Sequence, residues 1–171
     1  MISLNIFAKC PNTGNPKQRM GELLDKKGRS DLAKIMLINI LEEMHNINIS
    51  LKTNLWVYPN IDNEWIKKLS KKYFITLKKQ IGESLCSRMQ NCLLSESALG
   101  GKTLLIGTDI PALSKNKISE AIKTLNNNNI VIGPTYDEGF YLIGINGQES
   151  AQCLANCGNL KNYKDMKNMN S

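Results

Sequence analysis

Aromatic residues make up only 6% of this 171-residue chain, and histidine occurs once, as His45. The five cysteines include no C-x-x-C pair, and no apolar run is long enough to cross a membrane. A zinc site of the usual spacing is therefore excluded. The chain does not begin with a charged segment followed by an apolar core, so we expect a cytoplasmic protein with free thiols and no membrane span.

Arginine is also scarce. Three of the 22 basic residues are arginine, namely Arg19, Arg29 and Arg88, and the formal net charge is +7. The lysines are spread along the chain, with few aromatic residues between them. This differs from the clustered basic and aromatic stripe of nucleic-acid-binding surfaces, so we expect no nucleic-acid partner. The positive charge can instead steer anionic small molecules toward the protein.

Short apolar segments alternate with amphipathic ones along the chain. This alternation predicts an α/β fold with a mostly parallel central sheet and helices on both faces. We expect Ser30 and Ser114 to be helix N-caps. The predicted strands are 2–8, 54–58, 73–77, 102–108, 129–133 and 140–145, and the predicted helices are 31–46, 62–71, 82–99 and 114–125. Residues 1–148 are expected to form one nucleotide-binding domain, followed by a diverged or frayed tail over 149–171.

Two acidic residues follow predicted strands. The apolar run 104–106 breaks at a glycine and leads to Asp109, and the strand at 129–133 leads to Asp137. Ligands of α/β sheets bind at such strand ends, and carboxylates there can hold a divalent cation against phosphates. The alternatives are structural: Asp109 could cap the turn before Pro111, and Asp137 could bond its own backbone in a turn.

A basic loop follows the first predicted strand. It contains Lys9, Lys17 and Arg19 and, at Gly14, a residue free to take a positive φ. Cations beside the backbone N–H groups of a helix start can cradle phosphates. The spacing of a Walker A loop is absent. An arginine fork binds phosphate in a way that lysine cannot, which favours a role for Arg19, whereas Lys9 could equally be a solvated side chain.

Residues 7–20 resemble the F-A-K-x-P-x-x-G-x-x-K-T-R-L motif of small bacterial GT-A-like nucleotide-diphospho-sugar transferases. These proteins are usually described as glycosyltransferases and are similar in outline to molybdenum-cofactor and phospholactate nucleotidyltransferases. Segments 82–89, 107–111 and 133–144 resemble later motifs of the same family, in the same order. The chain departs from the family pattern at Gln18, Ser84, Cys86 and Glu138. It also has no counterpart of the family's tryptophan-containing segment after residue 145.

The resemblance implies a Rossmann-like GT-A fold and a set of site residues. Asp109 and Asp137 would be catalytic and would bind Mg²⁺ or Mn²⁺. Arg88, one helical turn after Ser84, would face the same cleft, although an ion pair between its helix and a loop is the alternative. The residues implied to bind the nucleotide or its phosphates are Lys9, Gly14, Lys17, Arg19 and Arg88.

We therefore expect a metal-dependent transferase that uses a nucleotide-sugar or a nucleoside triphosphate as donor, with a small-molecule acceptor that the sequence does not identify. A nucleotidyltransferase that releases pyrophosphate is the alternative chemistry. The departures at Ser84 and Glu138 and the short C-terminal part also suggest a different class of protein, a non-catalytic nucleotide-binding remnant. The sequence carries no indication of an oligomeric state.

Overall fold

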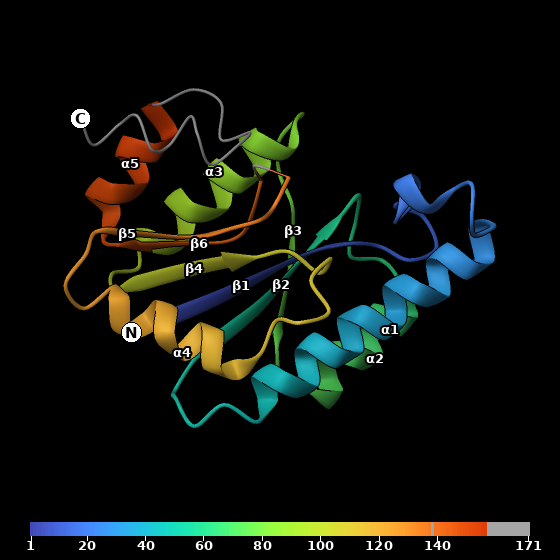
Figure 1. Cartoon of the computed structure of the whole chain (residues 1–171), viewed down its shortest axis with the longest axis horizontal. Helices are drawn as coiled ribbons and strands as arrows, with labels where there is room; N and C mark the ends of the chain where they lie inside the picture. The colour runs from blue at the N-terminus through green and yellow to red at the C-terminus, as the bar shows by residue number, and fades with distance from the viewer. Residues whose placement is uncertain (138, 157–171) are drawn as a thin grey trace.

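The computed structural model describes residues 1–137 and 139–156, and a six-stranded sheet forms its centre (Figure 1). The strands are β1 (Ile2–Lys9), β2 (Lys52–Tyr58), β3 (Thr76–Lys79), β4 (Lys102–Ile106), β5 (Ile130–Pro134) and β6 (Phe140–Asn146). They lie in the order β3-β2-β1-β4-β6-β5. β1 to β4 pair in parallel, and only β6 runs antiparallel to its neighbours β4 and β5. The predicted mostly parallel α/β sheet is thus confirmed.

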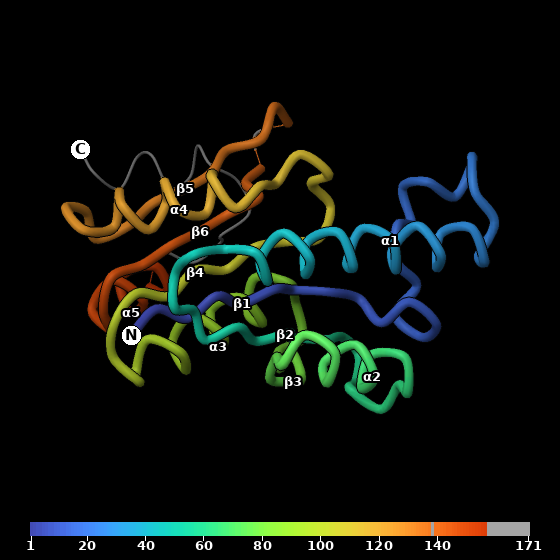
Figure 2. Tube along the Cα trace, turned by 90° about the horizontal axis from the view of Figure 1, so that it is seen from below, coloured from blue at the N-terminus to red at the C-terminus, as the bar shows by residue number. Residues whose placement is uncertain are grey.

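Helices cover both faces of the sheet. They are α1 (Lys26–His45), α2 (Glu64–Lys72), α3 (Leu85–Ser97), α4 (Lys115–Thr124) and α5 (Gln148–Asn156), with a short 3-10 helix, η1 (Gln18–Met20). α1, α2 and α4 lie on one face, and α3 and α5 lie on the other (Figure 1). Figure 2 shows that the chain between β1 and α1 extends beyond the sheet, on the right of the view, before it turns back into α1. No helix in the described residues combines the length and the apolar composition that a membrane crossing requires.

Alternating side chains of the central strands fill two cores. On β1, Leu4 and Ile6 pack into the core under α1, α2 and α4, whereas Phe7 packs into the core under α3 and α5. The same alternation on β4 directs Leu104 to the first core and Leu105 to the second. This two-residue period follows from the pleat of a strand. Because both faces of the central strands pack into apolar cores, the loops at the strand ends are where functional polar side chains can lie.

The start of α1 differs from prediction, whereas the start of α4 agrees with it, and α2 and α3 begin two and three residues later than predicted. α1 begins at Lys26, and its N-cap is Asp25, whose side chain accepts a hydrogen bond from the Gly28 amide at 2.7 Å. The prediction that Ser30 is the N-cap was therefore wrong: Ser30 is buried inside the helix and donates to Asn12 at 3.2 Å. Ser114 is the N-cap residue of α4, but its side chain makes no capping bond.

Two further segments differ from prediction. β3 begins at Thr76 rather than at residue 73, because Tyr73 forms the C-cap of α2. α5 was not predicted, and it packs against the sheet through Ser150, Ala151 and Leu154. Of the expected tail, residues 157–171 lie outside the described residues. Free thiols are confirmed for Cys10 and Cys92, which are both buried.

Candidate functional site

The predicted site residues lie at one edge of the sheet, on its loops, at the end of β1 and at the start of α3. β1 pairs in parallel with β2 on one side and with β4 on the other, so all three strands end at the same edge. The chain passes from β1 to β2 and β3 on one side and returns to place β4 on the other. Such a reversal of strand order is where open α/β sheets bind ligands.

The loop after β1 begins as a tight turn held on the end of β2. The Cys10 amide donates to the carbonyl oxygen of Tyr58 at 2.7 Å, and the Gly14 amide donates to the carbonyl oxygen of Cys10 at 2.8 Å. A Cβ atom at Gly14 would lie 2.8 Å from backbone atoms of Cys10 and of Tyr58. Glycine is therefore required at this position, because the backbone of these two residues leaves no room for a side chain. Gly14 does not take the positive φ that we expected; Asn15 and Lys17 do, with φ of 43° and 53°.

Lys17 and Asp109, which are 92 residues apart in sequence, form an ion pair between the β1 loop and the loop after β4. The Lys17 side chain is 9% exposed, whereas the Asp109 side chain is 77% exposed. The hydroxyl of Thr108 lies 3.5 Å from the same carboxylate oxygen. The fold thus brings a cation and an acid from two predicted motifs into direct contact.

A second, looser pair joins the same turn to the loop after β5. Nη1 of Arg19 lies 3.8 Å from Oδ2 of Asp137, and both side chains are exposed. The hydroxyl of Thr135 donates to Oδ1 of Asp137 at 2.6 Å. This hydrogen bond, assisted by backbone amides and by Arg19, holds the pKa of Asp137 below its ordinary value. The turn interpretation of Asp137 is therefore supported, and the carboxylate also faces Arg19. Its role as a metal ligand stays a prediction.

Arg88 lies in the first turns of α3, above the end of β2. Its guanidinium carbon is 4.1 Å from the centroid of the Tyr58 ring. Its Nε is buried without a hydrogen-bond partner, and no ion pair to Arg88 occurs within the described residues. The alternative of a helix-to-loop ion pair is thus not observed. Ser84 serves as the N-cap of α3, in a capping box with Ser87.

Lys9 ends β1 at the same edge, and its side chain is exposed.

Three residues that we did not predict support the site. The Tyr58 ring contacts the Arg88 guanidinium, the Thr135 hydroxyl donates to Asp137, and the Gln80 side chain bonds two neighbouring strands. The buried Gln80 side chain donates to the carbonyl oxygen of Ala8 at 3.2 Å and to that of Trp56 at 2.9 Å. Thr135, two residues before Asp137, could have been recognised from the spacing of Asx and Ser/Thr turns; Tyr58 and Gln80 had no such sequence pattern.

The acids fit a cation shared with a ligand better than a resident metal centre. Within residues 1–137 and 139–156, no group of three or more His, Cys, Asp or Glu side chains is arranged to hold a metal ion. Asp109 and Asp137 nevertheless offer hard oxygen ligands beside the same loop. Mg²⁺ is usually bound by one or two carboxylates together with substrate phosphates, so the donor set fits that mode. Binding of Mg²⁺ or Mn²⁺ stays a prediction.

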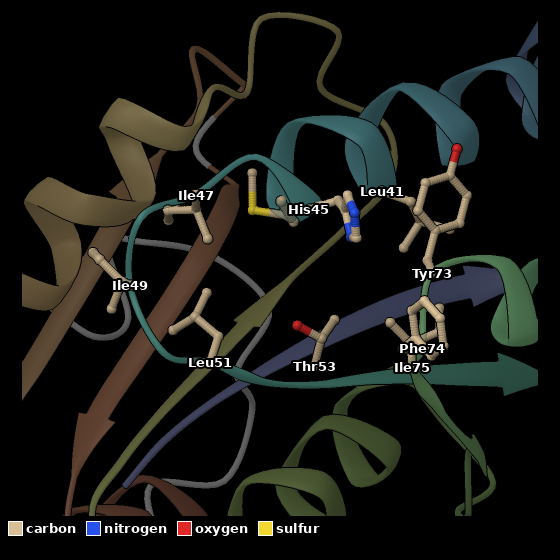
Figure 3. A pocket seen from close by; sticks show the side chains of 10 residues that line it. Leu41, His45, Ile47, Ile49, Leu51, Thr53, Tyr73, Phe74 and Ile75 are labelled. Atoms are coloured by element: carbon tan, nitrogen blue, oxygen red, sulfur yellow. The ribbon is translucent and has the colours of Figure 1, made fainter.

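Hollows in the surface do not coincide with these charged pairs. One, of about 180 Å³, lies at the opposite edge of the sheet, between the end of α1, the start of β2 and the end of α2 (Figure 3). The residues that line it are Leu41, Met44, His45, Ile47, Ile49, Leu51, Thr53, Tyr73, Phe74 and Ile75. Another, of about 420 Å³, lies between α1 and residues 111–114, next to the loop of Asp109. At the carboxyl edge, Lys17 and Arg19 from one loop meet Asp109 and Asp137 from two different strand ends, so we place the candidate site there.

Solved structures share this fold over nearly the whole chain. A "putative nucleotide-diphospho-sugar transferase" from Desulfovibrio desulfuricans G20 has a TM-score of 0.81 at 22% identity, covering 98% of this chain and 74% of that one. 4-Diphosphocytidyl-2C-methyl-D-erythritol synthase from Anaerococcus prevotii DSM 20548 has a TM-score of 0.66 at 14% identity, covering 98% and 80%. A cytidylyltransferase from Leptospira borgpetersenii serovar Hardjo-bovis has a TM-score of 0.60 at 10% identity. The match covers 91% of this chain and 63% of that one. The protein therefore has the α/β fold of nucleotide-diphospho-sugar transferase structures, as the sequence resemblance predicted.

The chain belongs to the DUF2064 family, described as "Uncharacterized protein conserved in bacteria", whose model matches residues 46–158. The matched range includes Asp109, Asp137 and Arg88, whereas the basic loop with Lys17 and Arg19 precedes it. No curated protein matches the sequence.

Proposed function

We propose that this protein is a transferase that uses a nucleotide-sugar or nucleoside triphosphate donor. One observation carries the proposal: two cations of a single turn, Lys17 and Arg19, meet Asp109 and Asp137 from different strand ends. The meeting point lies at the edge where α/β sheets bind ligands. The transferases among the structures with this fold support the same class of activity.

Each site residue has a distinct role in the proposal. Lys17 and Arg19 neutralise the charge that builds on the departing phosphates, while Arg88 and Lys9 make further phosphate contacts. The bare backbone at Gly14 lets the loop turn tightly against Cys10 and Tyr58 and so positions Lys17 and Arg19 for the donor. Asp109 and Asp137 would hold Mg²⁺ or Mn²⁺, and such a cation, when bound, would act as a Lewis acid on the phosphates. We further propose that the protein works in the cytoplasm.

Two chemistries use this arrangement. In glycosyl transfer, an acceptor attacks the sugar carbon and a nucleoside diphosphate leaves, as the sequence resemblance implies. In nucleotidyl transfer, an acceptor phosphate attacks the α-phosphorus and pyrophosphate leaves. The basic loop gives some support to the second chemistry, because a triphosphate needs more cationic contacts. Release of a nucleoside diphosphate or of pyrophosphate distinguishes the two.

Thermal unfolding with nucleoside triphosphates and nucleotide-sugars, each with and without Mg²⁺ or Mn²⁺, tests the proposal. A donor at a hundred times its Kd should stabilise the fold by about 2.7 kcal/mol, which raises Tm by several degrees. Asp109→Asn should lose the metal-dependent part of this shift. Asp62→Asn, which removes an exposed acid at the start of α2, is the matched control. A folded protein that no donor stabilises would contradict the proposal, and binding without any product would favour the non-catalytic alternative.

A further inference from the structure

The Lys17–Asp109 pair joins two residues with very different exposure. The Lys17 side chain is 9% exposed and the Asp109 side chain is 77% exposed. A buried ammonium needs an anionic partner, because leaving it unpaired costs its full desolvation penalty. An exposed carboxylate is well solvated and can leave the pair at little cost. Asp109 is thus the partner that can be exchanged, and Lys17 is the one that must remain paired.

The backbone fixes Lys17 in its position. Lys17 has the left-handed conformation, with φ 53° and ψ 39°, at the N-cap of η1, and Asn15 also has a positive φ. Left-handed backbone is unfavourable for residues other than glycine, so contacts of the loop must maintain it. The direct contact between Lys17 and Asp109 is one of these. The pair therefore holds the loop on the end of β4.

The Arg19–Asp137 pair offers a comparison within the same turn. Its charged atoms are 3.8 Å apart, and both side chains are exposed. The main partner of Asp137 is the Thr135 hydroxyl, at 2.6 Å. Loss of the Asp137 charge removes one negative charge from the same site without releasing a buried cation.

We propose that Asp109 competes with the phosphates of the donor for Lys17, so that the site without donor is closed by its own ion pair. This inference rests on the proposed function and adds regulation to the same site. An incoming phosphate takes the place of Asp109 at Lys17, and the released carboxylate becomes free to bind a divalent cation. Anion and cation binding are consequently coupled, and by linkage each strengthens the other to the same extent. Without a cation, Asp109 opposes anion binding.

A double-mutant cycle tests this competition with inorganic pyrophosphate as the probe, titrated by calorimetry in EDTA. The variants are Asp109→Asn, Lys17→Met and their combination, with Asp137→Asn as the charge-matched control. Asp109→Asn should bind pyrophosphate about fivefold more tightly than the wild type, as the strength of a partly exposed ion pair implies. In the Lys17→Met background the same substitution should change affinity less than about twofold, because the cation that it releases is absent. Asp137→Asn should also have an effect of less than about twofold.

Three results would overturn the inference: unchanged or weaker binding by Asp109→Asn, equal tightening with and without Lys17, or equal tightening by Asp137→Asn. In each of these cases the wild type still binds pyrophosphate, so the proposed function survives. If neither the wild type nor any variant binds pyrophosphate, with or without Mn²⁺, although circular dichroism shows that they are folded, both the inference and the proposed function fail.

Discussion

The guanidinium carbon of Arg88 lies over the ring of Tyr58, 4.1 Å from its centroid, and Nε is buried without a hydrogen-bond partner. A guanidinium carries five N–H donors, and here the described residues provide neither a hydrogen bond to its Nε nor an ion pair. The contact with the ring holds the guanidinium at the carboxyl edge, where an oxyanion ligand would supply the missing negative partner. The contact between Arg88 and Tyr58 connects the start of α3 with the end of β2. The turn at Gly14 lies beside it, since the Cβ position of Gly14 is 2.8 Å from the Tyr58 carbonyl oxygen.

Replacement of Arg88 by lysine should weaken nucleotide binding about tenfold, because lysine can neither stack as a plane nor offer a fork of donors. Calorimetric titration of the nucleotide that stabilises the protein best measures the loss. Tyr58→Phe is the matched control, since it keeps the ring, and its affinity should stay close to that of the wild type. Equal affinity of Arg88→Lys and wild type would remove Arg88 from the site.

Gly14→Ala should destabilise the loop and abolish most anion binding. The added Cβ would meet backbone atoms at 2.8 Å, closer than real contacts allow, so the turn must open. We expect a loss of about 1–3 kcal/mol in the free energy of unfolding, measured by urea denaturation. Gly107→Ala is the control at the neighbouring strand end, because nothing lies within 4 Å of its Cβ position. Comparable losses in both variants would show that close approach is not the reason for Gly14.

Much of the fold was predictable because apolar strands and amphipathic helices have distinct periods. The start of α1 was not, since Gly28 interrupts its first turns and the amphipathic pattern becomes clear only after Ser30. The observed N-cap is Asp25, whose side chain accepts a hydrogen bond from the Gly28 amide, so the helix begins before the predicted Ser30. α5 escaped prediction because it buries small residues, Ser150 and Ala151, rather than a clear apolar stripe.

The site was predictable as a set of motifs but not as a set of contacts. Strand-end acids and a basic loop identified Asp109 and Lys17, yet the pairing of these residues across 92 positions of sequence depends on β4 lying next to β1. The partnership of Arg88 with Tyr58 likewise follows from how α3 crosses the sheet. Side-chain pairs between distant segments come from the tertiary fold, and no local period encodes them.

Glu96→Ala should be strongly destabilising, by about 3–5 kcal/mol in the free energy of unfolding. The Glu96 side chain is fully buried, pairs with Lys78 and accepts a hydrogen bond from Asn54 at 3.0 Å. Its removal takes the carboxylate away from Lys78 and Lys52 and leaves Asn54 with Asn5 as its remaining acceptor. Urea denaturation measures the change, and Glu120→Ala, on the exposed face of α4, should stay within about 0.5 kcal/mol of the wild type. A similar small effect for Glu96→Ala would mean that Lys78 and Asn54 find other partners.

The loop of Asp137 should lose stabilisation in acid. The pKa of Asp137 is lowered in the folded state, chiefly by the hydrogen bond from Thr135. A lowered pKa means that the stabilising contribution is complete above the unfolded value, about 3.9, and is lost as the pH falls through the folded pKa. Thr135→Val should raise the pKa of Asp137 toward its ordinary value, which carboxyl NMR titration measures. An unchanged titration in Thr135→Val would show that the backbone amides or Arg19 dominate instead.

Phe74→Gly should stabilise the protein, by up to about 1 kcal/mol. Phe74 follows the C-cap of α2 with φ 53°, where its amide bonds the Lys71 carbonyl oxygen and the Ile75 amide bonds that of Ser70. Glycine is the favoured residue at this position of such a helix end, and the Phe74 ring is 90% exposed, so little burial is lost. Thermal unfolding should show Tm raised by about 2–4 °C. Phe74→Ala is the control, since it removes the ring and keeps the backbone strain. If Phe74→Gly were less stable than Phe74→Ala, the contacts of the loop beside the pocket of Figure 3, rather than the left-handed backbone, would decide stability there.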